Sequence, residues 1–226
     1  ERGIDEYKER FINCANWFLY QENGRYEYNF HWNDTAAPWI SCMAQGEAAS
    51  LLIRAYKITN NETYLQQAEK SLEPLFISID DGGVQSKLAD GSLFIEEYPS
   101  ANSTHVLNGF MYALIGVYEY AELSDSVRHK KLFDRLVKSL NSNICLWRDG
   151  KWSLYGDPAI SGGKNYCTPS YHNLQISQLT WLNKRVKMPE VTQTIMLWEK
   201  GLGSFTTRIR ALLGKAIFRL RNRAQR

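Results

Sequence analysis

Two adjacent glutamates and a tyrosine are the residues of this chain that most readily suggest chemistry. Glu96, Glu97 and Tyr98 follow an apolar, strand-like run within the stretch SLFIEEYPSANSTHVLNGF (92–110), and Pro99 comes next. Because a proline disfavours helical backbone in the residue before it, we expect Tyr98 to be extended at the mouth of a loop. Loop ends often carry function, and a plain turn with solvated acids is the alternative.

Two further tyrosines, Tyr155 and Tyr171, end later polar stretches, and His172 follows Tyr171 directly. A phenol can give and take a proton at a weakly acidic carbon. Its ordinary pKa is about 10, so as a base it needs a nearby cation or hydrogen-bond donors. Glu97 adds a carboxylate that acts as a base or polarises a phenol. The set favours proton transfer at a carbon next to a carboxylate, as in a uronic acid.

Glycoside hydrolysis is the contrasting chemistry, and it needs two carboxylates placed across the scissile bond. Glu96 and Glu97 are neighbours and cannot face each other across a sugar. The polar stretches otherwise offer only Asp149 and Asp157. Both stand in turn contexts, where aspartate is ordinary. Hydrolysis is therefore less favoured than proton transfer.

The apolar spacing predicts helices that must position these residues. They are expected at 4–18, 39–59, 63–75, 106–123, 127–140, 170–182 and 191–202. The capping residues of TNNE should begin the third helix, and the joint SDS should turn the fourth into the fifth as a helical hairpin.

Shorter stretches predict strands between the helices. RYEYNFHWND (25–34) alternates like a strand pair, and DGGV introduces the strand that ends at Glu96. Asp149-Gly150, inside CLWRDGKWSLYG, is the strongest hairpin signal in the chain. The sequence thus predicts a mainly α fold, an α/α toroid (an incomplete α/α barrel) of helical hairpins with β-hairpin excursions carrying the site. A plain helical bundle is the alternative, but bundles have short connections.

The chain of 226 residues is long enough for one sizeable core, and we expect a toroid domain at 1–203 and a basic amphipathic helix at 204–226. Of 27 Lys and Arg, seven lie in that tail, which leaves 20 against 24 acids, a net charge of −4 for the body. Neither part suits nucleic acid. The four cysteines lack metal-ligand spacing, so no metal and no cofactor are expected.

The tail has an apolar face and a basic remainder. Gly214 and Phe218 lie off that face. A helix of this kind lies on an anionic membrane surface or packs on its own domain or a partner, and the membrane surface is slightly favoured. The apolar face consists of Phe205, Ile209, Leu212, Leu213, Ala216 and Leu220.

Three stretches, in the same order along the chain, carry a family resemblance. SCMAQGEAASLLIRAY, FIEEYPSANSTHVLNGFMYALIGVYEY and YHNLQISQL resemble the C-terminal catalytic domain of D-glucuronyl C5-epimerases. These enzymes invert carbon 5 of glucuronic acid in heparan-type chains. The resemblance covers roughly residues 11–198, and the most specific part is EEYP with HVLNGF downstream. It implies an α/α toroid and a chemical step without metal or nucleotide.

The resemblance also implies residue roles. Glu97 and Tyr171 are expected to be the opposed acid/base pair, with Tyr98 and Tyr155 orienting the sugar and stabilising charge on its carboxylate. Asn108 is expected near the substrate. His172 and Lys164 complete the expected substrate-binding set.

The sequence departs from the family pattern at two positions. Pro158 stands where the pattern places an arginine that could clamp the uronate, and Gln175 replaces a second histidine. Lys164 is a candidate replacement for the arginine. No counterpart of the β-rich N-terminal domain of longer members is recognisable in the sequence.

The expected function is a uronic-acid carbon-5 epimerase acting on a polysaccharide or its lipid-linked precursor, with a homodimer left open. A polysaccharide lyase, which begins with the same proton abstraction, and a catalytically idle glycan-binding or assembly protein are the alternatives. The cysteine usage and the basic tail favour a bacterial cytoplasmic protein, peripheral at the inner membrane. The Golgi lumen is the alternative if an N-terminal anchor precedes this chain.

Overall fold

The computed structural model describes residues 2–222, and side chains from residue 5 onward. The predicted mainly α fold is confirmed, whereas closure into a toroid stays a prediction. The helices are α1 (Arg2–Trp17), α2 (Cys42–Thr59), α3 (Glu62–Leu72), α4 (Leu107–Ser124), α5 (Val127–Asn143), α6 (Pro169–Asn183), α7 (Pro189–Leu202) and α8 (Phe205–Arg221). Short 3-10 helices lie at Phe18–Tyr20, Glu73–Phe76, Ile79–Asp81 and Ile144–Trp147.

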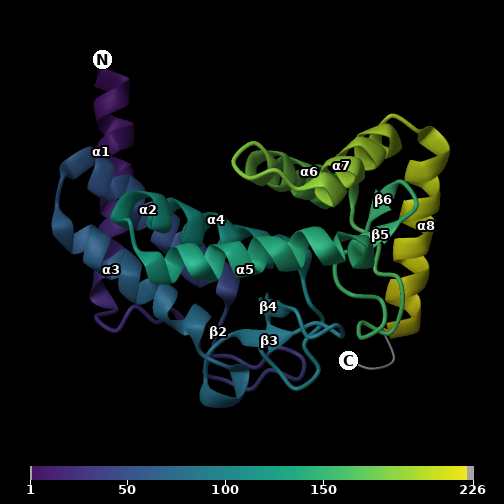
Figure 1. Cartoon of the computed structure of the whole chain (residues 1–226), viewed down its shortest axis with the longest axis horizontal. Coiled ribbons are helices and arrows are strands. Elements are labelled where there is room, and N and C mark those ends of the chain that lie inside the picture. The colour runs from purple at the N-terminus through teal and green to yellow at the C-terminus, as the bar shows by residue number, and fades with distance from the viewer. Residues whose placement is uncertain (1, 223–226) are drawn as a thin grey trace.

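Short antiparallel strand pairs lie between the helices in the described part of the chain. They are β1 (Glu27–Tyr28) with β2 (Trp39–Ile40), β3 (Gln85–Lys87) with β4 (Leu93–Ile95), and β5 (Arg148–Asp149) with β6 (Trp152–Ser153). α4 and α5 run side by side across the centre, with α1–α3 at one end and α6–α8 at the other (Figure 1). No helix among residues 2–222 is both long and apolar enough to cross a membrane.

The helix starts follow the capping residues in the sequence. Asn61 accepts a hydrogen bond from the Thr63 backbone N–H at 3.0 Å, as the TNNE prediction requires. Thr168 caps α6 in the same way, accepting from the Tyr171 N–H. The cap satisfies an otherwise unpaired N–H of the first turn, which places Tyr171 at the start of α6.

The hairpin at Asp149-Gly150 is confirmed, and Gly150 takes the positive φ of 60° that the turn requires. The expected strand pair within 25–34 is wrong. That stretch supplies only β1, which pairs with β2 in register Glu27↔Ile40 and Tyr28↔Trp39. β2 therefore takes the first two residues of the helix that the apolar spacing placed at 39–59, and α2 begins only at Cys42.

An aromatic stack fixes β4 against the central helix pair. The Phe94 ring stacks on Phe110 of α4 with centroids 4.4 Å apart and lies 5.7 Å from the ring of Trp147. All three side chains are fully buried. Large buried rings contribute much of the packing energy of a core, so the residues that follow β4 are held in place by this stack.

α8 docks on the domain through a face that the sequence pattern did not favour. Ala211 is buried with Trp152, Leu154 and Tyr166, and a Cβ added at Gly214 would lie 2.5 Å from Cδ2 of Tyr166. The residues on the expected apolar face, Phe205, Leu212, Leu213 and Leu220 among them, remain 50–74% exposed. Contact of that exposed face with a membrane stays a prediction.

Candidate active site

The two adjacent glutamates of the EEYP stretch have different surroundings. Glu96 follows β4 directly, whereas Glu97 lies in the bend that comes next. Glu96 Oε1 lies 2.6 Å from Nδ1 of His105 and also accepts a hydrogen bond from the Ser86 hydroxyl. Glu96 and His105 are both buried. Glu96 is therefore engaged in an internal polar network, and Glu97 is the carboxylate left for chemistry.

Glu97 is a buried carboxylate with one oxygen that is not hydrogen-bonded. The Tyr155 hydroxyl donates to its Oε1 at 3.3 Å, whereas Oε2 has no hydrogen-bond partner among the described residues. Burial raises the pKa of Glu97, and the nearby hydroxyls of Tyr98 and Tyr155 partly offset that rise. An unpaired oxygen on such a group can accept a proton from a bound molecule.

Of the three predicted tyrosines, Tyr98 and Tyr155 lie beside Glu97, and Tyr171 contacts Tyr155. The Tyr155 and Tyr171 rings meet edge to face with centroids 5.8 Å apart. Burial raises the pKa of both Tyr98 and Tyr155, and the negative charge of Glu97 raises it further. Both phenols therefore keep their protons at neutral pH and act as hydrogen-bond donors. Tyr171 is 43% exposed and is the tyrosine of the group most open to a bound molecule.

Aromatic rings from the N-terminal part hold Tyr98. Its ring lies 6.0 Å from that of Trp32 and 5.7 Å from that of Trp39, which in turn stacks on Tyr28 at 4.4 Å. The β1–β2 pair thus supports the tyrosine that follows β4. The structure brings Glu97, Tyr98 and Tyr155 together from segments that are up to 58 residues apart.

Two amides beside this group also have unpaired oxygens. Asn108 Oδ1 and Gln178 Oε1 are buried without a hydrogen-bond partner among the described residues. Gln178 Nε2 donates to the Asn108 backbone carbonyl at 3.2 Å, and Gly109 packs directly against Glu97. Buried polar atoms are normally paired, so these oxygens indicate places for donors from a ligand.

A cavity of about 440 Å³ opens between α1, α2, α4 and α6 on the Gln178 side. Glu47 and Tyr112 line it, together with Phe11 and Trp181. Gln178 lines the cavity and donates to the Asn108 carbonyl, and the next residue, Gly109, packs against Glu97, so the cavity lies near the carboxylate. Aromatic walls with a few polar groups are typical of carbohydrate-sized pockets. Glu47 was not predicted as a site residue.

His172 does not take part in this group, contrary to expectation. Its side chain is fully buried, and its ring stacks on Trp152 at 3.9 Å. Nδ1 lies 2.8 Å from the Ser153 hydroxyl, and Nε2 lies 3.2 Å from the Trp198 carbonyl oxygen. Burial lowers the pKa of His172 to about 4. His172 therefore anchors α6 as a neutral core residue.

Lys164 and the two departures from the family pattern lie outside the tyrosine group. Lys164 Nζ pairs with Asp149 at 2.8 Å. Pro158 follows Asp157, whose carboxylate accepts from the Ala159 N–H at 2.9 Å in an ordinary turn. Gln175 is buried and accepts a bond from the Cys167 thiol at 3.6 Å. No hydrogen bond or ion pair joins Lys164 to Glu97, Tyr98, Tyr155 or Tyr171 in the described structure.

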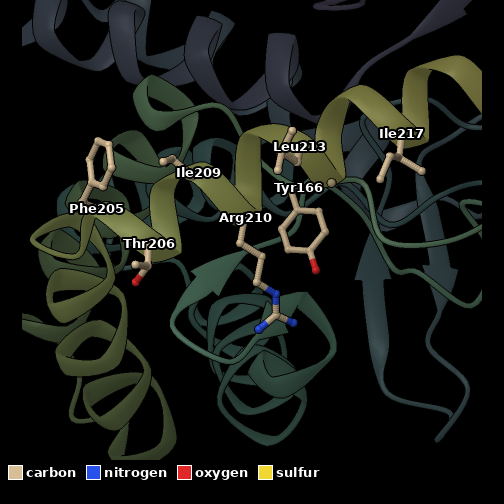
Figure 2. A pocket seen from close by; sticks show the side chains of 8 residues that line it. Tyr166, Phe205, Thr206, Ile209, Arg210, Leu213 and Ile217 are labelled. Atoms are coloured by element: carbon tan, nitrogen blue, oxygen red, sulfur yellow. The ribbon is translucent and has the colours of Figure 1, made fainter.

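α8 brings a lysine close to Tyr155. Its Lys215 Nζ lies 5.7 Å from the centre of the Tyr155 ring. Figure 2 shows Arg210 and Tyr166 pointing to the same side of α8, where Arg210 pairs with Asp149 at 2.8 Å. The sequence analysis did not single out Lys215. The sequence offers only a faint signal for it, since it is the one lysine among the arginines of the tail.

Comparisons with known proteins identify the family of the chain. The family described as D-glucuronyl C5-epimerase C-terminus matches residues 20–200. The chain is 29% identical over 216 residues to the D-glucuronyl C5-epimerase of Caenorhabditis elegans, covering 86% of this chain and 35% of that protein. It is 24% identical over 161 residues to an uncharacterized protein of Methanocaldococcus jannaschii, covering 70% of this chain and 51% of that protein.

The chain thus spans about a third to a half of the length of these curated relatives. The matched region contains Glu97, its three tyrosines and Asn108. The chain belongs to the D-glucuronyl C5-epimerase C-terminal family.

Proposed function

We propose that the chain is a uronic-acid carbon-5 epimerase that acts on a polysaccharide or its lipid-linked precursor. The observation that carries the proposal is the unpaired Oε2 of buried Glu97, beside Tyr98 and beside the Tyr155 hydroxyl, with Tyr171 against the Tyr155 ring. Proton abstraction at carbon 5 needs a base whose pKa lies closer to that of a weak carbon acid, and burial raises the pKa of Glu97 in that direction.

In the proposed reaction Glu97 takes the carbon-5 proton. The electron pair of the broken C–H bond delocalises into the sugar carboxylate, where the protonated hydroxyls of Tyr98 and Tyr155 donate hydrogen bonds to the growing charge. Tyr171 then gives its hydroxyl proton to carbon 5 from the opposite face, and the inverted sugar leaves. Glu97 then releases the proton it took to solvent, and the Tyr171 phenolate takes one from solvent, so the reaction has no net change in redox state or atoms.

The cavity supports a polymeric substrate. The unpaired oxygens of Asn108 and Gln178 suit sugar hydroxyl donors, and Tyr112 and Trp181 line the wall against which a neighbouring sugar would lie. We place the reacting uronate at Glu97 and the adjoining residue of the chain in the cavity. The relative from C. elegans is named a D-glucuronyl C5-epimerase, which makes glucuronate the first uronate to test.

The test is proton NMR of heparosan incubated with the protein in deuterated water. Deuterium at carbon 5 without chain cleavage supports the epimerase. A product that absorbs in the ultraviolet, with loss of the substituent at carbon 4, indicates the lyase alternative instead. Binding of heparosan without deuterium uptake indicates the idle glycan-binding protein, and it overturns the proposal.

Substitutions separate the proposed roles from folding. Glu97→Gln and Tyr171→Phe should each lower carbon-5 exchange by about 10²–10⁴-fold, which is the usual contribution of general acid/base groups. Tyr64→Phe is the matched control, because the buried Tyr64 hydroxyl bonds Asn16 at 2.5 Å, away from Glu97. Exchange retained in both Glu97→Gln and Tyr171→Phe refutes the assignment of the two bases.

A further inference from the structure

We propose that Lys215 of α8 binds the carboxylate of the uronate beside Tyr155, where it supplies the cation that the Pro158 position lacks. The proposal rests on the proposed function, because it assumes that a uronate occupies the site at Glu97. It makes α8 part of the substrate-binding site.

The position of Lys215 carries the proposal. Its Nζ lies 5.7 Å from the centre of the Tyr155 ring, and the Tyr155 hydroxyl donates to Glu97 Oε1 at 3.3 Å. Tyr155 therefore has the carboxylate at its hydroxyl end and a cation near its ring. Tyr171 meets the same ring edge to face at 5.8 Å. A ligand placed against these two tyrosines lies within reach of the flexible lysine side chain.

Lys215 also lacks an anionic partner. Its Nζ donates to the neutral Asn165 Oδ1 at 2.7 Å, and no carboxylate within residues 5–222 pairs with it. The nearby cations Lys164 and Arg210 are both paired with Asp149, at 2.8 Å each. Burial of the side chain lowers the pKa of Lys215. A desolvated cation without a counter-ion is costly, and a bound anion removes that cost.

The packing of α8 holds the lysine in this position. Ala211, one turn before Lys215, is buried against Trp152 and Leu154. Gly214 leaves no room for a side chain against Tyr166, whose hydroxyl also bonds Asp149. These contacts fix the 211–215 face of the helix against the second excursion. Lys215 thus projects toward Asn165 and Tyr155 from a rigid support.

The charge of the site gives the lysine its role. A uronate brings its own negative charge to a place that already holds Glu97, and like charges repel strongly where water is excluded. The protonated phenols supply hydrogen-bond donors but no positive charge. A cation near Tyr155 offsets the repulsion and favours charge build-up on the sugar carboxylate.

The test compares two tetrasaccharides that differ only in charge: a heparosan tetrasaccharide and the same molecule with its carboxyl groups reduced to alcohols. Calorimetry should show that the protein binds the acidic form at least about tenfold more tightly, as expected for a hydrogen bond to a charged group. In Lys215→Met the preference should disappear, with the affinity for the neutral form unchanged. Lys215→Arg, which keeps the charge, should retain it.

Two controls distinguish binding from structure. Asn165→Ala removes the hydrogen-bond partner of Lys215, and it should keep the preference if the lysine binds the ligand and lose it if the lysine only ties α8 to the domain. Lys164→Met should also keep it, because Lys164 pairs with Asp149. A preference that survives in Lys215→Met, or one that is absent from the unaltered protein, overturns the proposal.

Parallel measurement of carbon-5 exchange keeps this proposal separate from the proposed function. Exchange together with an unchanged preference in Lys215→Met refutes the lysine's role and leaves the epimerase standing. A lysine-dependent preference without exchange refutes the epimerase and supports the carboxylate-binding lysine.

Discussion

Gly109 is the position where a single methyl group should test the placement of Glu97. It lies in the first turn of α4, and a Cβ added there would be 2.8 Å from Cβ and 2.9 Å from Cδ of Glu97, and closer still to Oε2. Real Cβ atoms do not approach so closely, so Gly109→Ala must displace the carboxylate. Glu97 is buried and has little room to move.

Two opposing effects set the expected loss of stability. Overpacking a core costs about 1–3 kcal/mol. Alanine in place of glycine within a helix returns about 0.5–1 kcal/mol. Gly109→Ala should therefore reduce the free energy of unfolding by about 0–2.5 kcal/mol, and each kcal/mol lowers Tm by about 2–4 °C for a chain of this size. Activity should suffer more, since misplacing a reacting group by about 1 Å can cost roughly 10²-fold.

The assay pairs calorimetric Tm with the rate of carbon-5 deuterium uptake from heparosan. Glu97→Asp shortens the side chain, so the double variant Gly109→Ala with Glu97→Asp should recover part of the Tm lost in Gly109→Ala. Gly116→Ala is a control in the same helix, because its added Cβ would lie 2.9 Å from the Cα of Gly46 instead. Unchanged Tm and unchanged exchange in Gly109→Ala would refute the packing of Glu97 against α4.

Three further outcomes follow from the site and its supports. The folded-state pKa of Glu97 is raised, so ionisation of Glu97 lowers the stability of the fold as pH rises through that pKa. Glu97→Gln should therefore raise Tm at pH 7. A lower Tm in calorimetry contradicts the burial argument. His172 has a folded pKa of about 4 and an ordinary one of about 6.5, so stability should fall as pH drops from about 6.5 toward 4, and His172→Gln should flatten that part of the Tm profile. If the exposed face of α8 binds membranes, the protein should sediment with anionic vesicles but not with zwitterionic ones. Leu213→Glu, on that exposed face, should weaken the binding. Equal sedimentation with both vesicle types contradicts the electrostatic part of the prediction.

The helices and their order could be predicted because local rules decide them. The hairpin of α4 and α5, the Asn61 cap and the Asp149-Gly150 turn follow from apolar spacing, capping and turn residues within short windows. The β1–β2 pairing could not be predicted in this way. Its partners are separated by the loop 29–38, and strand pairing across such a loop depends on what both strands pack against.

The residue types of the candidate site could be predicted from the sequence, but residue type alone did not show which side chains face the site and which are engaged in the core. Residue type alone does not distinguish Glu96 from Glu97, and only the family resemblance selected Glu97. The contacts of Glu96 with His105 and Ser86 show that Glu96 is the one engaged in the interior. His172 was chosen because it follows Tyr171. A helix, however, turns adjacent residues about 100° apart, so the neighbour of an exposed tyrosine faces the core.

In the tail helix, the clearest apolar pattern in the sequence marks a face that does not pack on the domain. Apolar spacing selected the face with Leu212 and Leu213, yet the domain contacts the face with Ala211 and Gly214. Close contact between a helix and a ring needs small residues, and small residues contribute little to an apolar pattern. The same geometry explains why Lys215 was overlooked. Lys215 lies on the face with the small residues, so the apolar pattern grouped it with the solvated cations of the tail. In the described structure it is the cation of α8 that lies near Tyr155.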